Sequence, residues 1–477
     1  MDTQFFTEVL VVGGGVAGTS AILHLRSKDV TLIESSGSNT AVAAWNIMIR
    51  DADQLAEVML RAGEEMNDRE LLSVFVDRHS SAVSELESLG VRFRKSNIGL
   101  IPKLRSVGAG MHAILRSHVS GKEPKIIRGR VVSFLVGRDN PGHVEGVVVL
   151  TQDGGEISVF CRHLILAGGG MSGIYPFSTG ESRVNGSLLA LAYDAGIELI
   201  DIEFSMFHPF LIVDSRFPRH LISGEILTRM NFTDADGHPF LSEVAADALR
   251  NNRHHWMFSF ITREFYLQSL RGGIFAVIDA DREWFERFKS DDEFGFVFSG
   301  HSLDDIGKIE IHPAFHFTLG GVRVDAFSRS NMENVYVVGE MAGGLHGAGR
   351  VGGTALIEGW IFGRRAAEHV NDRPDGREAW KGNRDIVRTS EGHTGVSSEA
   401  RAYVWKALGP VRNGPDLLTA GKWLRDNALS AEERLIGAMV NASLLREETV
   451  GAFIREDFPT VRDKRHSYVC GTNVRFE

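Results

Sequence analysis

The strongest constraint on the fold is a glycine cluster that follows a short apolar segment near the N-terminus. Residues 8–12 read EVLVV, as expected for a buried parallel strand, and residues 13–18 read GGGVAG before a helical segment. A second apolar run, DVTLIE at 29–34, completes a β–α–β unit of about 30 residues. This pattern predicts an α/β protein built on a parallel sheet.

Gly13, Gly15 and Gly18 form the pattern G-x-G-x-x-G between that strand and the helix. The first glycine permits the turn, the second lets the backbone approach a pyrophosphate, and the third lets helix and strand pack closely. Glu34 ends the next strand, where a carboxylate can bind a ribose hydroxyl. These residues predict dinucleotide binding, and the alternative is a glycine-rich turn beside an exposed glutamate.

A second strand, turn and helix follow much later in the chain. VYVVGE at 335–340 precedes a glycine-rich turn and a helix that starts near Thr354. The N-terminus of such a helix can stabilise negative charge on a reduced flavin ring. Spacing alone leaves two interpretations open, a flavin site or a further β–α unit of a large domain.

The bulk composition narrows the class of protein. The chain has 477 residues and a net charge of −10, which does not favour nucleic-acid binding. No apolar run is long enough to span a bilayer, so we expect no direct membrane insertion. Cys161 and Cys470 are too few to hold an iron–sulfur cluster and fit a reducing cytosol. We expect no metal site, because the adjacent His254 and His255 diverge and lack a third ligand at helical spacing.

Several segments resemble the succinate dehydrogenase/fumarate reductase flavoprotein family, which includes L-aspartate oxidases. EFSMFHPF at 203–210 resembles EFxQFHPT, HFTLGGVRVD at 316–325 resembles HYTMGGIxVD, and HGAGRVGG at 346–353 resembles HGANRLGG. Residues 334–368 are similar to the C-terminal flavin motif of the family. The resemblance covers nearly the whole chain.

The resemblance implies FAD as the cofactor. It implies that Gly339 and Glu340 lie near the FAD ribose and that Thr354, Ala355 and Leu356 lie along the ring. Residues 36–46, SGSNTAVAAWN, stand where the family lines the flavin, which adds Asn39 and Thr40 to the cofactor site. Membrane-bound members carry a histidine there that links covalently to the flavin, so Asn39 implies non-covalent FAD.

The resemblance and the order of the segments predict a discontinuous architecture. We expect an α/β fold with a Rossmann-like FAD-binding domain over 1–205 and 325–371 and an inserted α+β capping domain over 206–324. A linker over 372–397 and a C-terminal helical domain over 398–477 follow.

The same motifs nominate the residues that carry the chemistry. His208, His316 and Arg350 would clamp a small carboxylic acid, since a guanidinium matches a carboxylate in bidentate fashion. Arg263, in FITREFYLQSL, resembles the family's general acid or base in VVSRAIYxEI, and Glu225 resembles its proton-relay glutamate. The alternative interpretation is that the histidines are ordinary core residues and that the arginines are solvated surface residues.

Several positions depart from the family pattern. The relay motif E-A-V-R becomes residues 225–229, EILTR, so its arginine is missing or displaced to Arg229. Phe210 replaces the threonine of HPT, and we expect it to make one pocket wall smaller and less polar. A GDG turn becomes GSL at 186–188, and the REGGHS segment of aspartate oxidases has no match. The C-terminal LLREETVGAFIREDFP at 444–459 keeps only part of ALxRxESRGxHxRxDxP.

The resemblance therefore implies an FAD-dependent oxidoreductase that is fumarate reductase/succinate dehydrogenase-like, and the two cysteines predict a cytoplasmic location. It would transfer a hydride between flavin and a small carboxylic acid, with direction, electron donor or acceptor and oligomeric state left open. One alternative is an L-aspartate oxidase-like enzyme, or an oxidase of another amino or carboxylic acid. A flavin-binding protein without chemistry is the last alternative.

Overall fold

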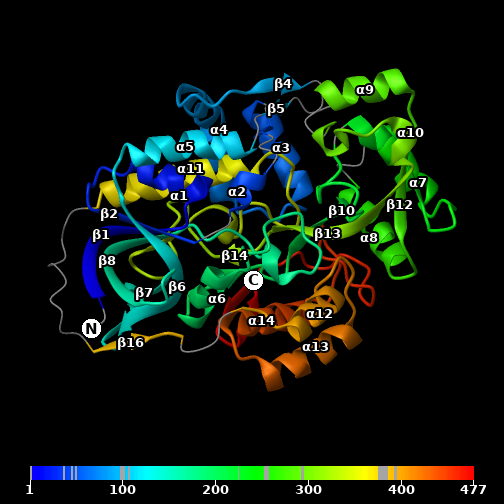
Figure 1. Cartoon of the computed structure of the whole chain (residues 1–477). Helices are drawn as coiled ribbons and strands as arrows, with labels where there is room; N and C mark the ends of the chain where they lie inside the picture. The colour runs from blue at the N-terminus through cyan, green and yellow to red at the C-terminus, as the bar shows by residue number, and fades with distance from the viewer. Residues whose placement is uncertain are drawn as a thin grey trace.

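The computed structural model describes three packed units (Figure 1). The described residues are 3–35, 38–43, 47–48, 51–96, 103–105, 108–223, 225–251, 257–291, 295–373, 385–390 and 395–477. The predicted absence of a metal site at His254-His255 lies outside the described residues.

A mostly parallel sheet forms the centre of the first unit. Strand β1 (Thr3–Val12) lies between β2 (Val30–Glu34) and β8 (Glu156–Leu166) and runs parallel to both. The parallel set continues outward to β6 (Lys125–Gly137) and β15 (Val335–Val337), while β7 (Asn140–Thr151) joins β6 and β8 antiparallel. Because parallel strands share one direction, the carboxyl ends of β1, β2, β8 and β15 meet at one edge of the sheet.

Two helices that are distant in the sequence pack closely on this sheet. Helix α1 (Val16–His24) lies against α11 (Ala355–Asn371), as Figure 1 shows. A Cβ atom at Gly363 would lie 2.3 Å from the Ala17 carbonyl oxygen, and one at Gly359 would lie 2.8 Å from a methyl carbon of Val16. The two glycines therefore allow a distance between the helices that larger side chains would forbid.

Shorter elements surround this pair of helices. Helices α4 (Arg69–Ser88) and α5 (Gly108–Ser120) lie on the same side of the sheet as α1 and α11 (Figure 1). The others are α2 (Asn39–Val42), α3 (Ala52–Ala62), α6 (Ser187–Asp194) and the small sheet of β3 (Ile47–Met48), β4 (Arg94–Ser96) and β5 (Lys103–Arg105). Within the described residues, none of the helices has the length and apolar character needed to cross a bilayer.

The second unit lies within the stretch predicted as a capping domain and has its own core. Its antiparallel sheet has the order β10 (Ser205–Ile212), β13 (Lys308–Thr318), β12 (Ile274–Ile278) and β11 (Met230–Thr233). Helices α7 (Glu243–Arg250), α8 (Phe258–Ser269), α9 (Arg282–Asp291) and α10 (Leu303–Ile306) complete it. A separate apolar cluster rich in phenylalanine fills the space between the sheet and these helices.

The third unit differs in part from the predicted helical domain. Helices α12 (Ser398–Ala407), α13 (Gly414–Asn427) and α14 (Ala431–Leu445) form it, but the chain then returns as a β-hairpin. That hairpin, β17 (Ser467–Cys470) and β18 (Asn473–Phe476), extends a sheet with β9 (Leu199–Ile200) and β14 (Gly321–Val322). The predicted linker also contains a strand, β16 (Ile386–Arg388), which pairs with β6. Strands of two to four residues are too short to show a readable period.

A buried cluster of charges joins the third unit to the first. The Arg446 guanidinium lies 2.7 Å from the Glu203 carboxylate and 2.8 Å from that of Glu448. Both Arg446 and Glu203 have at most 1% of their side chains exposed. Ser467 donates a hydrogen bond of 2.7 Å to Glu203, so the cluster also holds the C-terminal hairpin. Such pairs are costly to break, because one charge stays buried without its partner.

We predict that Glu203→Gln lowers the free energy of unfolding by about 3 kcal/mol, because it leaves positive charge uncompensated in the cluster. The measurement is denaturant unfolding of the mutant and the native chain. Glu477→Gln, which removes a partner of the partly exposed Arg475, serves as a control and should change little. An equal effect of the two substitutions would contradict the assigned role of the cluster.

Candidate active site

One cavity of about 830 Å³ extends along the carboxyl edge of the parallel sheet. It begins at the glycine turn after β1 and reaches the strands β10 and β13 of the capping unit. Residues from both predicted parts of the site, for the cofactor and for the carboxylic acid, therefore line the same space. The edge is the place where open α/β sheets bind their ligands.

The glycine turn at one end has the geometry that its motif predicts. Gly13 adopts a φ of +110°, and a Cβ atom there would lie 2.2 Å from the Ala167 carbonyl oxygen. A Cβ at Gly18 would lie 1.9 Å from the Gly13 carbonyl oxygen, so neither position accepts a side chain. Gly15 caps α1 and lines the cavity, which brings the N-terminus of this helix to the cavity, where its N–H groups could meet an anion.

Glu34 lines the cavity as predicted, but it is paired with an arginine. The Arg116 guanidinium, from α5, lies 2.9 Å from the Glu34 carboxylate. Its Nη1 atom is buried and has no hydrogen-bond partner among the described residues. A Cβ atom at Gly14 would lie 2.7 Å from Glu34 and 3.1 Å from this Nη1 atom. Because glycine has no Cβ, the space beside both groups stays open. No sequence pattern marks Arg116, because the contact joins α5 to β2 through the fold.

The helix α11 contributes the second predicted cofactor segment. Ala355 and Leu356 line the cavity at its N-terminus. Thr354 caps the helix but is fully buried, and its hydroxyl donates to the Val351 carbonyl oxygen at 2.7 Å. The contact of Ala355, Leu356 and Thr354 with the ring stays a prediction, and the Thr354 hydroxyl is engaged with the backbone that precedes the helix.

Glu340 lies deep between the two ends of the cavity. Its carboxylate accepts a hydrogen bond of 3.0 Å from the Thr318 N–H, and Gly339 before it adopts a φ of +70°. Burial raises the pKa of Glu340 to about 7. Asn39 and Thr40 line the cavity nearby, and their side-chain oxygens accept hydrogen bonds from Glu181 N–H and Val16 N–H.

His208, His316 and Arg350 lie together at the other end, although three separate segments carry them. The ring centroids of the two histidines are 5.4 Å apart, and all three side chains line the cavity. Arg350 lies over the Phe317 ring at 4.4 Å, and its Nη1 donates to the Val351 carbonyl oxygen. Its Nε is buried without a hydrogen-bond partner among the described residues, so the guanidinium has donor capacity left for an anion.

The charges in this group differ among its members. Burial, together with the nearby Arg350, lowers the pKa of His316 to about 3, so its ring is neutral at pH 7. Thr179 holds His316 Nδ1 at 2.8 Å. Burial lowers the pKa of Arg350 to about 10, which still leaves it charged. A cation beside a neutral imidazole suits one carboxylate that also accepts a neutral hydrogen bond.

Phe210 does not form the predicted cavity wall. It is fully buried in the capping core, stacked on Phe232 with ring centroids 5.4 Å apart and edge-on to Phe265 at 5.1 Å. The register of β10 shifts after His208, which explains why Phe210 does not follow His208 into the cavity. Its N–H instead donates to His208 Nδ1 at 3.3 Å, so a neutral His208 ring carries its proton on Nε2.

Other residues of the capping unit line the cavity without any sequence signal. Phe258 meets the His208 ring edge-on at 5.0 Å, and His220 and Leu227 also line the cavity. Burial lowers the pKa of His220. These positions follow turns and helix starts, where side-chain direction is not readable from a period.

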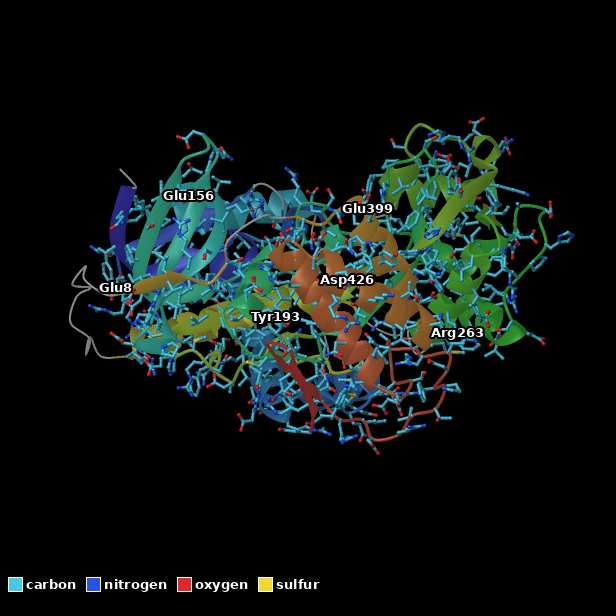
Figure 2. All side chains as sticks on the ribbon, turned by 90° about the horizontal axis from the view of Figure 1, so that it is seen from below. Glu8, Glu156, Tyr193, Arg263, Glu399 and Asp426 are labelled. Carbon is cyan, nitrogen blue, oxygen red and sulfur yellow. The ribbon has the colours of Figure 1, made fainter. Side chains whose placement is uncertain are left out.

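Arg263, the predicted general acid or base, stands apart from this group. Arg263 is half-buried on α8 and is not among the residues that line the cavity. It precedes Tyr266 by three residues, and the Tyr266 ring meets Trp405 of α12 at 5.9 Å, so this side of α8 faces the third unit. Figure 2 shows Arg263 on the green capping unit near the orange C-terminal helices.

The relay residues share a short 3-10 helix, Glu225–Arg229. The Glu225 side chain lies outside the described residues. The Arg229 guanidinium lies over the Trp284 ring at 5.7 Å, within the capping unit. Whether Arg229 takes the place of the family's relay arginine therefore stays open.

Known flavin-binding proteins resemble this chain in sequence and in fold. The model of a family described as FAD binding domain matches residues 8–356. An L-aspartate oxidase of Pyrococcus abyssi is 30% identical over 95% of this chain and 96% of the relative. A CoM/CoB fumarate reductase chain of Methanothermobacter marburgensis is 25% identical over 97% and 96%. A variant of FrdA from the E. coli quinol fumarate reductase has the same fold, with a TM-score of 0.81, 18% identity, and coverage of 99% and 97%.

The fold, the cavity and these matches define an FAD-dependent oxidoreductase. The chain belongs to the succinate dehydrogenase/fumarate reductase flavoproteins, the family that includes L-aspartate oxidases. The predicted family, fold class and cofactor are thereby confirmed. The residues fit FAD, since the glycine cradle admits no side chain and Arg116 Nη1 has no partner within the described protein.

We predict that Arg116→Met weakens FAD binding about 10- to 100-fold, because charge-assisted hydrogen bonds to ribose or phosphate oxygens are lost. Quenching of FAD fluorescence during titration of the FAD-free protein measures the dissociation constant. Arg388→Met, which breaks a surface pair with Glu156, is the matched control and should bind FAD normally. An unchanged constant for Arg116→Met would mean that this arginine only orients Glu34.

Proposed function

We propose that this enzyme transfers a hydride between FAD and a carbon next to the carboxylate of a small carboxylic or amino acid. The observation that carries the proposal is the group of His208, His316 and Arg350 in the cavity that also holds the cofactor residues. Arg350 supports it most directly, because a guanidinium whose buried Nε donor is unused calls for an anionic ligand.

The proposed roles follow from charge and tautomer. Arg350 binds the carboxylate and remains charged, while neutral His316, together with His208, offers hydrogen bonds to the same or a second polar group. Bound FAD supplies the acceptor or donor of the hydride. Positive charge beside the carboxylate also stabilises negative charge that develops on the substrate during transfer. Holding the reacting carbon in one orientation supplies a further part of the rate.

A proton must be lost or gained along with the hydride, and we propose Arg263 for this step, with Glu225 as its relay. The support is the resemblance of FITREFYLQSL to the family's motif. Phe258, on the same helix, faces the cavity, whereas Arg263 is not among the lining residues and stands one turn before Tyr266, whose ring contacts Trp405 of α12. The role therefore requires the Arg263 side chain to reach the cavity around Phe258 or with a movement of α8.

Two substrates follow from the relatives. The relative that is 30% identical is named L-aspartate oxidase, which favours L-aspartate as the reductant. The relative named fumarate reductase supports the fumarate and succinate pair as a second candidate. We further propose that FAD is non-covalent, because Asn39 offers an amide at the cavity, and that the enzyme acts in the cytoplasm, where unpaired Cys161 and Cys470 persist.

The first experiment is an anaerobic titration of the FAD-loaded protein, followed by its visible spectrum. Bleaching of the flavin band by L-aspartate supports the oxidase, and bleaching by succinate or reoxidation by fumarate supports the alkene chemistry. Loss of this response in Arg350→Gln, but not in the exposed Arg462→Gln, would support carboxylate binding by Arg350. A flavin that responds to no small carboxylic or amino acid contradicts the proposed function.

We predict that Arg263→Gln slows the reaction with the active acid at least about 100-fold, because general acid–base catalysis contributes on this scale. FAD content should stay unchanged, since Arg263 does not line the cavity. Arg271→Gln, an exposed arginine just beyond the same helix, is the control. Equal rates for the two variants would exclude Arg263 from proton transfer.

A further inference from the structure

We propose that residues 450–453, VGAF, form a positioning turn that sets the orientation of Arg350 from the C-terminal unit. This inference rests on the proposed role of Arg350 in binding the carboxylate. The turn follows α14 and lies far from the cofactor residues in sequence, and it is part of the stretch that departs from the family pattern. It contacts the Arg350 segment through both backbone and side chains.

The backbone contact is specific to one carbonyl group. Ala452 N–H donates a hydrogen bond of 2.8 Å to the carbonyl oxygen of Ala348, two residues before Arg350. Gly451 adopts a φ of +55°, and a Cβ atom there would lie 2.3 Å from the same oxygen. On its other side, Ala348 N–H donates to the Gly63 carbonyl oxygen at 3.0 Å. The segment that leads to Arg350 is thus held between two parts of the chain.

The side-chain contact reaches the guanidinium through one ring. Val450 and Phe453 belong to a small apolar cluster that also contains Phe204, Phe317 and Ala348. Phe453 lies 5.4 Å from Phe204 between ring centroids, and Phe317 is the ring on which Arg350 lies at 4.4 Å. A displacement of the turn would therefore change both the backbone and the ring that support Arg350.

The turn itself is fixed by buried arginines. Arg412 lies over the Phe453 ring at 4.7 Å, and Arg446 lies over the Phe204 ring at 4.7 Å. Arg455 Nη1 donates to the Arg446 carbonyl oxygen at 3.1 Å, which ties both ends of this stretch together. All three side chains are buried, so the position of the turn is determined by the charge cluster that docks the third unit.

The sequence change is consistent with this role. Where the family motif reads ESRGxHxR, the chain reads ETVGAFIR, so Val450 and Phe453 stand at the arginine and histidine positions. Two polar groups are replaced by apolar ones, and both now belong to the cluster beneath Arg350. Gly451, which the close contact requires, is retained.

The test compares two glycine substitutions that differ only in their surroundings. Gly451→Ala pushes a methyl group against Ala348, whereas Gly471→Ala has the same φ of +55° and meets nothing within 4 Å. The FAD-loaded enzymes are assayed with L-aspartate and succinate. Gly451→Ala should raise KM about 10- to 100-fold with full FAD content, because a misplaced binding group loses affinity on this scale. Gly471→Ala should leave KM unchanged.

A second pair covers the case in which Gly451→Ala does not fold. Phe453→Leu keeps an apolar side chain and should retain a KM near that of the native enzyme, whereas Phe453→Ala should raise it. An unchanged KM in Gly451→Ala, or in Phe453→Ala if only that variant folds, overturns the positioning role while leaving the proposed function intact. A native enzyme whose flavin responds neither to these two acids nor to any other small carboxylic or amino acid overturns the proposed function, and this inference with it.

Discussion

The close contact between α1 and α11 is the constraint on which the rest of the structure depends. Each helix starts at the carboxyl edge of the sheet, after β1 and after β15, and their N-termini reach the same cavity. Gly359 and Gly363 allow this contact because a side chain at either position would collide with α1. Two strand–turn–helix segments from opposite ends of the first unit thereby become one binding site.

The polar end of the cavity depends on how the capping unit meets that site. β10 and β13 carry His208 and His316 to the edge of the cavity, while the phenylalanine core of the unit remains separate. Burial keeps His316 neutral and leaves Arg350 as a charged group among weakly solvated neighbours. A low-dielectric environment strengthens the attraction between such a cation and a carboxylate, which favours binding without a second cation.

The third unit contacts the rest of the chain through buried arginines as well as through its helices. Its buried arginines contact Glu203, just before β10, and the ring of Phe453. The third unit therefore meets the rest of the chain close to the segments that carry His208 and Arg350. A charge cluster of this kind tolerates little rearrangement, because each buried charge needs its partner. The position of the segment that carries Arg350 and the docking of the third unit are therefore physically linked.

Local patterns in the chain predicted the glycine turn and Glu34, whereas the second flavin segment and the segments of His208, His316 and Arg350 were nominated by their resemblance to family motifs. Turn residues and strand periods act over a few positions, so they can be read directly. They could not reveal Arg116 beside Glu34, Thr179 beside His316, or Phe317 beneath Arg350, since these contacts join distant segments. They also misled on Phe210, because a register shift in β10 turned its side chain into the capping core. The face of the strand to which a side chain points after such a shift is decided by tertiary packing, which exists only in the folded molecule.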